Sequence, residues 1–142
     1  MATLIKMKMQ RGFGGFPTDR PEKAEKNVIL VGIDKTTVKD PEAAMGHLFL
    51  PPRGGTKIHY HTKTSAHFYY VIKGRVRWFI GPSSEEFDME AGDFLYIPRG
   101  EIHSTLNLSE TEPAEQILCY LGVPSFDFDD TGNVDLGPLM KK

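Results

Sequence analysis

The sequence has little that would indicate a disulfide-rich, membrane or nucleic-acid-binding protein. Its single cysteine, Cys119, cannot form an intramolecular disulfide, which fits a reducing, cytoplasmic compartment. Cys119 lies in an apolar run, so we expect a buried thiol in the core. No apolar run approaches the roughly 20 residues that span a bilayer, so we expect no membrane association. The formal net charge of −2 leaves no basic excess to neutralise a phosphate backbone, so we expect no nucleic-acid partner.

Long helical periodicity is also missing. From residue 28 onward, short apolar stretches are separated by Gly and Pro turn signals at intervals of about 8 to 12 residues. One helical turn is expected at residues 41–44. The expected strands are 28–33, 46–50, 57–61, 67–72, 75–80, 86–90, 94–97, 102–108 and 115–122. This pattern predicts an all-β sandwich or barrel, and 142 residues suffice for a single domain with one core.

The chain divides into three parts. Residues 1–27 form an irregular N-terminal arm whose apolar side chains we expect to pair as an edge strand, on this domain or exchanged with a partner subunit. Residues 28–123 form the β-barrel. Residues 124–142 form an acidic C-terminal tail, expected to be solvated or packed on a partner. The run from Asp127 is not a calcium loop, because Pro138 stands where a bidentate Glu is needed.

Histidines give the clearest chemical signal. His59 and His61 alternate on one expected strand, so their side chains share a face. His67 opens the next strand after a short polar loop, and His103 opens a later one. Imidazole is a good ligand for transition metals, so this grouping predicts a site for one divalent ion. His47 has no partner at a suitable spacing and is expected to be structural.

The glycines, prolines and histidines together resemble the two conserved motifs of the cupin superfamily. The second motif corresponds to Gly92, Pro98, Arg99, Gly100, His103 and Asn107, and the first to Gly54, Gly55, His59, Tyr60, His61 and Gly74. The resemblance covers roughly residues 45–122. It implies a single-domain cupin-type β-barrel, a jelly-roll-like double-stranded β-helix. It also implies that His59, His61, His67 and His103 are the metal ligands.

The first motif departs from the family pattern at one ligand. His67 stands where cupins usually have a glutamate, and the loop before it is one residue longer than usual. A site of four neutral histidines leaves the full charge of a divalent ion in place, which favours an anionic ligand. Four protein ligands on an octahedral ion also leave two positions for a substrate. The longer loop could let His67 swing away from the metal. Asn107 is expected to support the sheet.

The fold alone does not name a reaction. The first hypothesis is a metalloenzyme of the dioxygenase or oxidoreductase type, acting on a small organic substrate chelated at the metal. The second is a non-redox cyclase, isomerase or lyase acting on a polyketide- or sugar-type substrate, and the third is a binding protein without turnover. The metal could be Fe, Mn, Zn, Ni or Cu. Tyr69, on the same strand face as His67, is the candidate catalytic residue, and we expect a homodimer.

Overall fold

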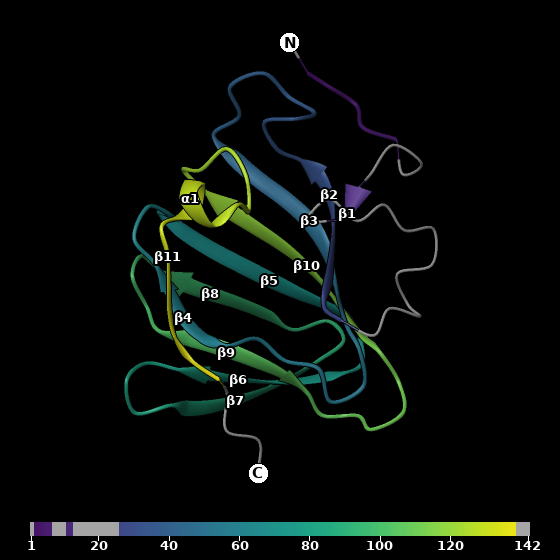
Figure 1. The fold of residues 1–142 in the computed structure, drawn as a ribbon. Coiled ribbons are helices and arrows are strands. Elements are labelled where there is room, and N and C mark those ends of the chain that lie inside the picture. Colours follow the sequence, from purple (N-terminus) through teal and green to yellow (C-terminus); the bar gives the residue numbers. More distant parts are fainter. Residues whose placement is uncertain (1, 7–10, 13–25, 139–142) are drawn as a thin grey trace.

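Two antiparallel β-sheets enclose a shared core in the computed structural model, which describes residues 2–6, 11–12 and 26–138 (Figure 1). The helix and strands run in this order: β1 (Arg11–Gly12), β2 (Val28–Ile33), β3 (Ala43–Leu50), β4 (Ile58–His61), β5 (Ala66–Lys73), β6 (Arg75–Ile80), β7 (Glu85–Glu90), β8 (Phe94–Pro98), β9 (His103–Asn107), β10 (Ala114–Leu121), α1 (Phe128–Thr131) and β11 (Asn133–Gly137). The all-β prediction is confirmed, and the nine expected strands are present with ends shifted by at most three residues.

The strands form a six-stranded and a five-stranded sheet. The first has the order β1-β2-β3-β10-β5-β8 and the second the order β11-β4-β9-β6-β7. Strand β10 is central to the first sheet, because it pairs along its whole length with β3 on one side and with β5 on the other. Consecutive strands therefore often lie in different sheets, and the histidines of β4, β5 and β9 come from both layers.

Period-two alternation builds the core between the sheets. Along β10, buried side chains alternate with half-buried ones, so that Leu118 and Tyr120 face inward. Trp78 of β6 is buried, and Tyr69 and Val71 share the inward face of β5 with His67. The predicted parity of β5 is thus confirmed, and it places Tyr69 beside the histidines.

Tight turns hold these strands in register. Gly92, between β7 and β8, has φ 97°, and Gly100, just before β9, has φ 76°. Residues other than glycine rarely adopt a positive φ, so both turns require glycine. The turn at Gly100 delivers His103 to the interior at the first position of β9.

Three sequence expectations are wrong. The helical turn at 41–44 is absent, since Ala43 already belongs to β3 and pairs with Leu121. The described part of the C-terminal segment is not a solvated tail. It forms α1 and β11, and β11 pairs with β4 along the side of the barrel (Figure 1). Cys119 is half-buried on the outer face of β10, because the strand's alternation turns Leu118 and Tyr120 inward instead.

The N-terminal arm falls mostly outside the described residues. Within them, β1 pairs antiparallel with β2 through Arg11 and Gly12, and Leu4 is exposed. No helix in the described ranges is long and apolar enough to cross a membrane.

Candidate metal centre

Strand pairing brings histidines from β4, β5 and β9 together in the barrel interior. Strands β4 and β9 meet at one register pair, His59 and His103, whose ring centroids are 4.2 Å apart. His61 lies two residues further along β4, with its ring 4.9 Å from that of His59. His67 of β5 comes from the opposite sheet, and its ring lies 5.2 Å from His61 and 4.5 Å from His103.

Three of these histidines have the spacing of metal ligands. His59, His61 and His103 each offer one nitrogen, and these nitrogens lie within 4.8 Å of one another. His67 does not belong to that closely spaced group, although its ring contacts two of its members. The structure thus brings all four predicted residues together, while the role of His67 as a fourth ligand stays a prediction.

Backbone carbonyls fix which nitrogen faces the centre. The Nδ1 atom of His59 lies 2.6 Å from the carbonyl oxygen of Lys57, and Nδ1 of His103 lies 2.8 Å from that of Glu101. A carbonyl can only accept, so both Nδ1 atoms carry the proton and Nε2 keeps its lone pair. Metal-ligating histidines have this arrangement, because a hydrogen bond to the second nitrogen sets the tautomer.

Several nitrogens of the cluster are buried without a hydrogen-bond partner among the described residues. These are Nε2 of His103 and both ring nitrogens of His61. A buried polar atom without a partner costs about 1 to 3 kcal/mol, so an arrangement of this kind needs a ligand to offset the cost. A metal ion would satisfy the lone pairs, and the residues present therefore fit one.

Burial keeps the cluster neutral. Burial, together with the charges of the neighbouring histidines, lowers the pKa of His61 and of His67 to about 3. Burial also lowers the pKa of His59, and that of His103 well below its usual value. The imidazoles are therefore unprotonated near neutral pH, which is the form that binds a metal.

The loop before His67 is held by the C-terminal segment. The amide of Thr62 donates to the carbonyl of Gly132 at 2.9 Å, and that of Lys63 to Thr131 at 3.0 Å. The backbones approach so closely that a Cβ atom at Gly132, whose φ is 68°, would collide with Thr62. This loop contains the extra residue relative to the cupin motif, and its contacts anchor it at the barrel.

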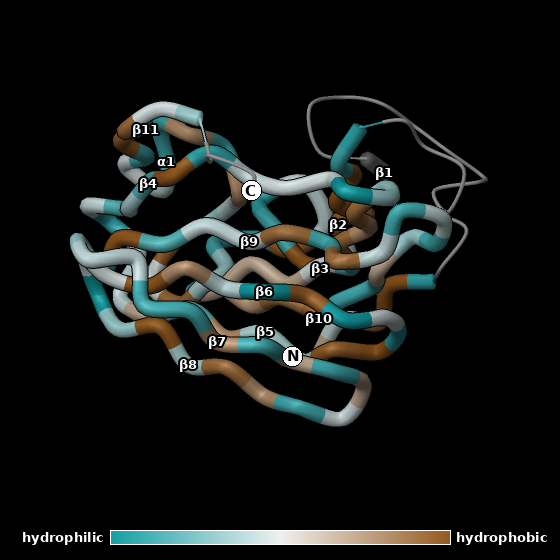
Figure 2. Tube along the Cα trace, turned by 90° about the horizontal axis from the view of Figure 1, so that it is seen from below, coloured by the Kyte–Doolittle hydropathy of each residue, from teal (hydrophilic) through white to brown (hydrophobic). Residues whose placement is uncertain are grey.

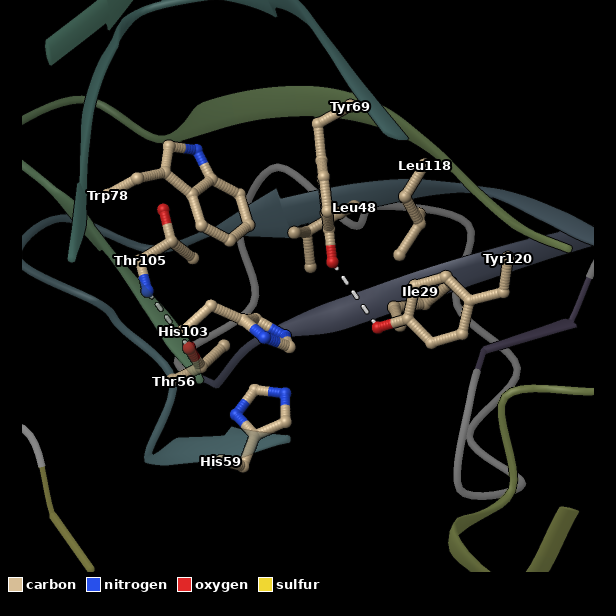
Figure 3. Close-up of a pocket in the computed structure, with 10 residues that line it drawn as sticks. All are labelled: Ile29, Leu48, Thr56, His59, Tyr69, Trp78, His103, Thr105, Leu118 and Tyr120. Atoms are coloured by element: carbon tan, nitrogen blue, oxygen red, sulfur yellow. Dashed lines mark hydrogen bonds between the residues drawn. The ribbon is translucent and has the colours of Figure 1, made fainter. Parts of the chain in front are cut away.

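A small cavity of about 60 Å³ adjoins the histidines (Figure 3). Aromatic and hydroxyl-bearing side chains meet aliphatic ones in its wall, which consists of Ile29, Leu48, Thr56, His59, Tyr69, Trp78, His103, Thr105, Leu118 and Tyr120. None of these side chains is a carboxylate, an amine or a guanidinium. The cavity wall is thus free of acidic and basic side chains other than the histidines, and it adjoins a group of potential metal ligands.

Two tyrosine hydroxyls meet in this cavity. The oxygens of Tyr69 and Tyr120 are 3.3 Å apart (Figure 3). The Tyr69 oxygen also lies 3.4 Å from Nδ1 of His67. Burial raises the pKa of Tyr69 well above its usual value and that of Tyr120 to about 12, so both hydroxyls keep their protons. The sequence singled out Tyr69 but missed Tyr120, which the alternation of β10 could have placed on the inner face.

Three further polar residues, His47, Arg77 and Asn107, lie outside the cavity wall. His47 bonds Glu115 at 2.9 Å on the outer side of the barrel, as a structural histidine. Arg77 forms a two-pronged ion pair with Asp88. The side-chain amide of Asn107 donates to three backbone carbonyls, those of Leu50, Pro51 and Glu112, and so supports the loops as expected.

Comparison with known proteins identifies the fold. Residues 46–120 match a family model described as a cupin domain. A solved structure of a Streptomyces PAC13 variant with uridine is 16% identical, with 99% of this chain and 94% of that chain covered and a TM-score of 0.68. The polyketide cyclase RemF from Streptomyces resistomycificus is 17% identical, with 85% and 80% covered and a TM-score of 0.65.

Larger proteins contain the same fold. Oxalate decarboxylase from Bacillus subtilis, described with Mn(II) centres, is 22% identical, with 80% of this chain covered and a TM-score of 0.64. The alignment spans 29% of that chain, and 61% of the Schizosaccharomyces pombe Cnp3 cupin domain. A comparison with curated protein sequences finds no significant match. At these identities the likeness shows the fold and leaves the reaction open.

Proposed function

The chain belongs to the cupin family, and on this basis we propose that it is a metalloenzyme acting on a small organic substrate at a centre of four histidines. One observation carries the proposal. The buried nitrogens of His61 and His103 have no partner among the described residues, while His59, His61 and His103 present ligand atoms within 4.8 Å of one another. His67 completes the proposed ligand set from the opposite sheet.

The side chains of the cavity would do the remaining work. A divalent ion bound there would supply Lewis-acid or redox chemistry. Leu48 and Leu118 would exclude water from the space beside the histidines, and the hydrogen-bonded hydroxyls of Tyr69 and Tyr120 lie at the wall that a ligand would contact. The small volume limits the part of the substrate that enters to a few non-hydrogen atoms, so a larger substrate would insert only its reacting end.

The first reaction class is oxygen-dependent oxidation. The all-imidazole donor set supports it, because imidazole suits redox-active ions such as Fe and Cu. The absence of carboxylates from the cavity wall also leaves the charge of the ion available to a chelating substrate anion.

A second class is non-redox cyclisation, isomerisation or lysis. The observation that favours it is the hydrogen-bonded pair of protonated tyrosines, which has one hydroxyl proton left to donate to an oxygen that gains negative charge. The structural likeness to a polyketide cyclase supports this class as well. Neither class needs the cysteine, since Cys119 lies on the outer face.

Elemental analysis tests the site first. The protein is purified without an affinity metal column, beside His59→Ala, His61→Ala, His67→Ala and His103→Ala, with His47→Ala as a control histidine outside the site. We expect close to one divalent ion per chain in the wild type and the control, and a loss in the four site variants. Full metal content in both His67→Ala and His103→Ala would refute the four-histidine centre.

Oxygen dependence then separates the reaction classes. Substrate screens are run in air and under argon on the metal-loaded protein. Turnover that stops under argon supports oxidation, whereas turnover by Zn-loaded protein under argon supports the second class. Tight binding without any product would mean that the chain is a ligand-binding cupin instead.

We propose in addition that the chain forms a homodimer through the outer face of β5 and β8. Ring contacts join Phe68 to Tyr96 and Tyr70 to Phe94 into one aromatic patch. Phe94 is 79% exposed and Tyr96 63% exposed, and Figure 2 shows brown, hydrophobic segments along β8. The patch offers about 400 Å², about half of what each partner buries in a stable interface. Pairing along β8, the last strand of its sheet in the described chain, would supply more area.

A further inference from the structure

A hydrogen-bonded series of three side chains, His67, Tyr69 and Tyr120, leads from the histidine cluster into the cavity. His67 and Tyr69 lie two residues apart on the inner face of β5, and Tyr120 of β10 is the register partner of His67. The Tyr120 ring packs 4.9 Å from His67 and 5.1 Å from His61. Figure 3 shows the hydroxyls of Tyr69 and Tyr120 pointing toward each other beside His103.

Metal binding by His67 sets the direction of the first hydrogen bond in this series. Binding through Nε2 requires the proton to sit on Nδ1, which then donates to the Tyr69 oxygen at 3.4 Å. If the bonds run in one direction, Tyr69 then donates its own proton to the Tyr120 oxygen at 3.3 Å. The opposite order would need Nδ1 as an acceptor and a proton on Nε2, which would block the metal.

The hydroxyl proton of Tyr120 is left over in this order. Tyr120 makes no other hydrogen bond with the described residues, and its side chain forms part of the cavity wall. A buried O–H group without an acceptor costs free energy, so a ligand oxygen in the cavity would offset that cost.

The charge of the cavity indicates what kind of oxygen this is. Its wall has no charged side chain, and its histidines bind metal as neutral imidazoles. No charge in the cavity wall, which includes Leu48 and Leu118, would compensate that of a bound ion, so a negative ligand is favoured there. A volume of about 60 Å³ holds roughly four water-sized groups, which matches a carboxylate or enolate terminus.

We propose that Tyr120 is the ligand-contacting donor of this site and that its hydroxyl holds one oxygen of a small oxygen monoanion, a carboxylate or an enolate. The inference rests on the proposed metal centre and deepens it by naming the substrate class. Tyr69 is then a positioning residue. It accepts a hydrogen bond from His67 and donates one to Tyr120, which orients the Tyr120 hydroxyl, and it does not contact the ligand.

Anion binding to the cobalt-loaded protein tests this assignment without any substrate. The visible bands of Co(II) report a change in its ligands, and acetate is compared with acetamide, its neutral counterpart of similar shape. The variants are Tyr120→Phe and Tyr69→Phe. Tyr70→Phe is the matched control, since that hydroxyl lies on the outer face of β5.

We expect acetate to bind the wild type and the control more tightly than acetamide does. Loss of a hydrogen bond to a charged acceptor should weaken acetate binding to Tyr120→Phe about tenfold or more, with cobalt affinity unchanged. Tyr69→Phe should weaken acetate less. The double variant should lose less than the product of the two single losses, because both changes interrupt one chain.

Three outcomes would overturn the proposal. Unchanged acetate affinity in Tyr120→Phe would remove the donor role, and equal binding of acetamide and acetate would remove the anion class; both leave the metal centre intact. A wild type that takes up no cobalt would overturn the metal centre as well. Thermal unfolding verifies that each variant is folded. Tyr69→Phe breaks the same series of hydrogen bonds at a second position and so tests it independently.

Discussion

Acid should destabilise the metal-free protein through its buried histidines. His61 is 4% exposed and His67 2% exposed, and burial lowers the pKa of each to about 3. In the unfolded chain a histidine has a pKa of about 6.5, so between these values the unfolded state binds more protons. Stability is then fully present above about pH 7.5 and falls as the pH drops through 6.5 toward 3.

The size of the effect follows from these two pKa values. Between pH 7.5 and pH 5, each such histidine removes about 2 kcal/mol from the free energy of unfolding. His61 and His67 together remove about 4 kcal/mol, which is a large part of the 5 to 15 kcal/mol typical of a small domain. His59 and His103 act in the same direction, because burial lowers the pKa of both.

Urea unfolding of the EDTA-treated protein at a series of pH values measures this slope. His67→Gln should lose about 2 kcal/mol of the difference in unfolding free energy between pH 7.5 and 5. Leu118→Val is the control, since it weakens the same core without removing a titrating group. If His67→Gln kept the wild-type slope, or if the wild type were equally stable at both pH values, the argument from burial would be refuted.

Other predictions concern the metal, the C-terminal strand and the dimer. The wild type should gain stability with added Zn²⁺, and His103→Ala should lose most of that gain in its melting temperature. Removal of residues 133–142 should weaken metal affinity at least about tenfold in a chelator competition, because β4 loses its pairing with β11; unchanged affinity would contradict this. Phe94→Glu should halve the mass measured by light scattering if the aromatic patch forms a dimer, and an unchanged mass would rule that interface out.

Strand positions were predictable because their signals are local. Alternation, glycine turns and the spacing of His59 and His61 depend only on neighbours in the chain. The parity of β5 correctly placed Tyr69 beside His67. The family motifs added that His103 returns to the same place, which no local pattern could indicate.

The errors came from contacts between distant segments. Nothing near Asn133 indicates that residues 133–137 pair with β4, since that pairing joins strands about 70 residues apart. The same holds for Tyr120, whose importance depends on a partner 51 residues away. The apolar neighbours of Cys119 predicted a core position, whereas the alternation of β10 places its side chain on the outer face.

The ligand strand β4 depends on a segment that the cupin match does not include. The match ends at residue 120, yet β4 is joined to β9 by a single register pair, His59 with His103, while β11 pairs with it at four positions. The loop after β4 is likewise held by Thr131 and Gly132. The positions of His59 and His61 therefore depend on residues after 120. The spacing of the histidines in the motif is not sufficient to define the site, because β11 is needed as well.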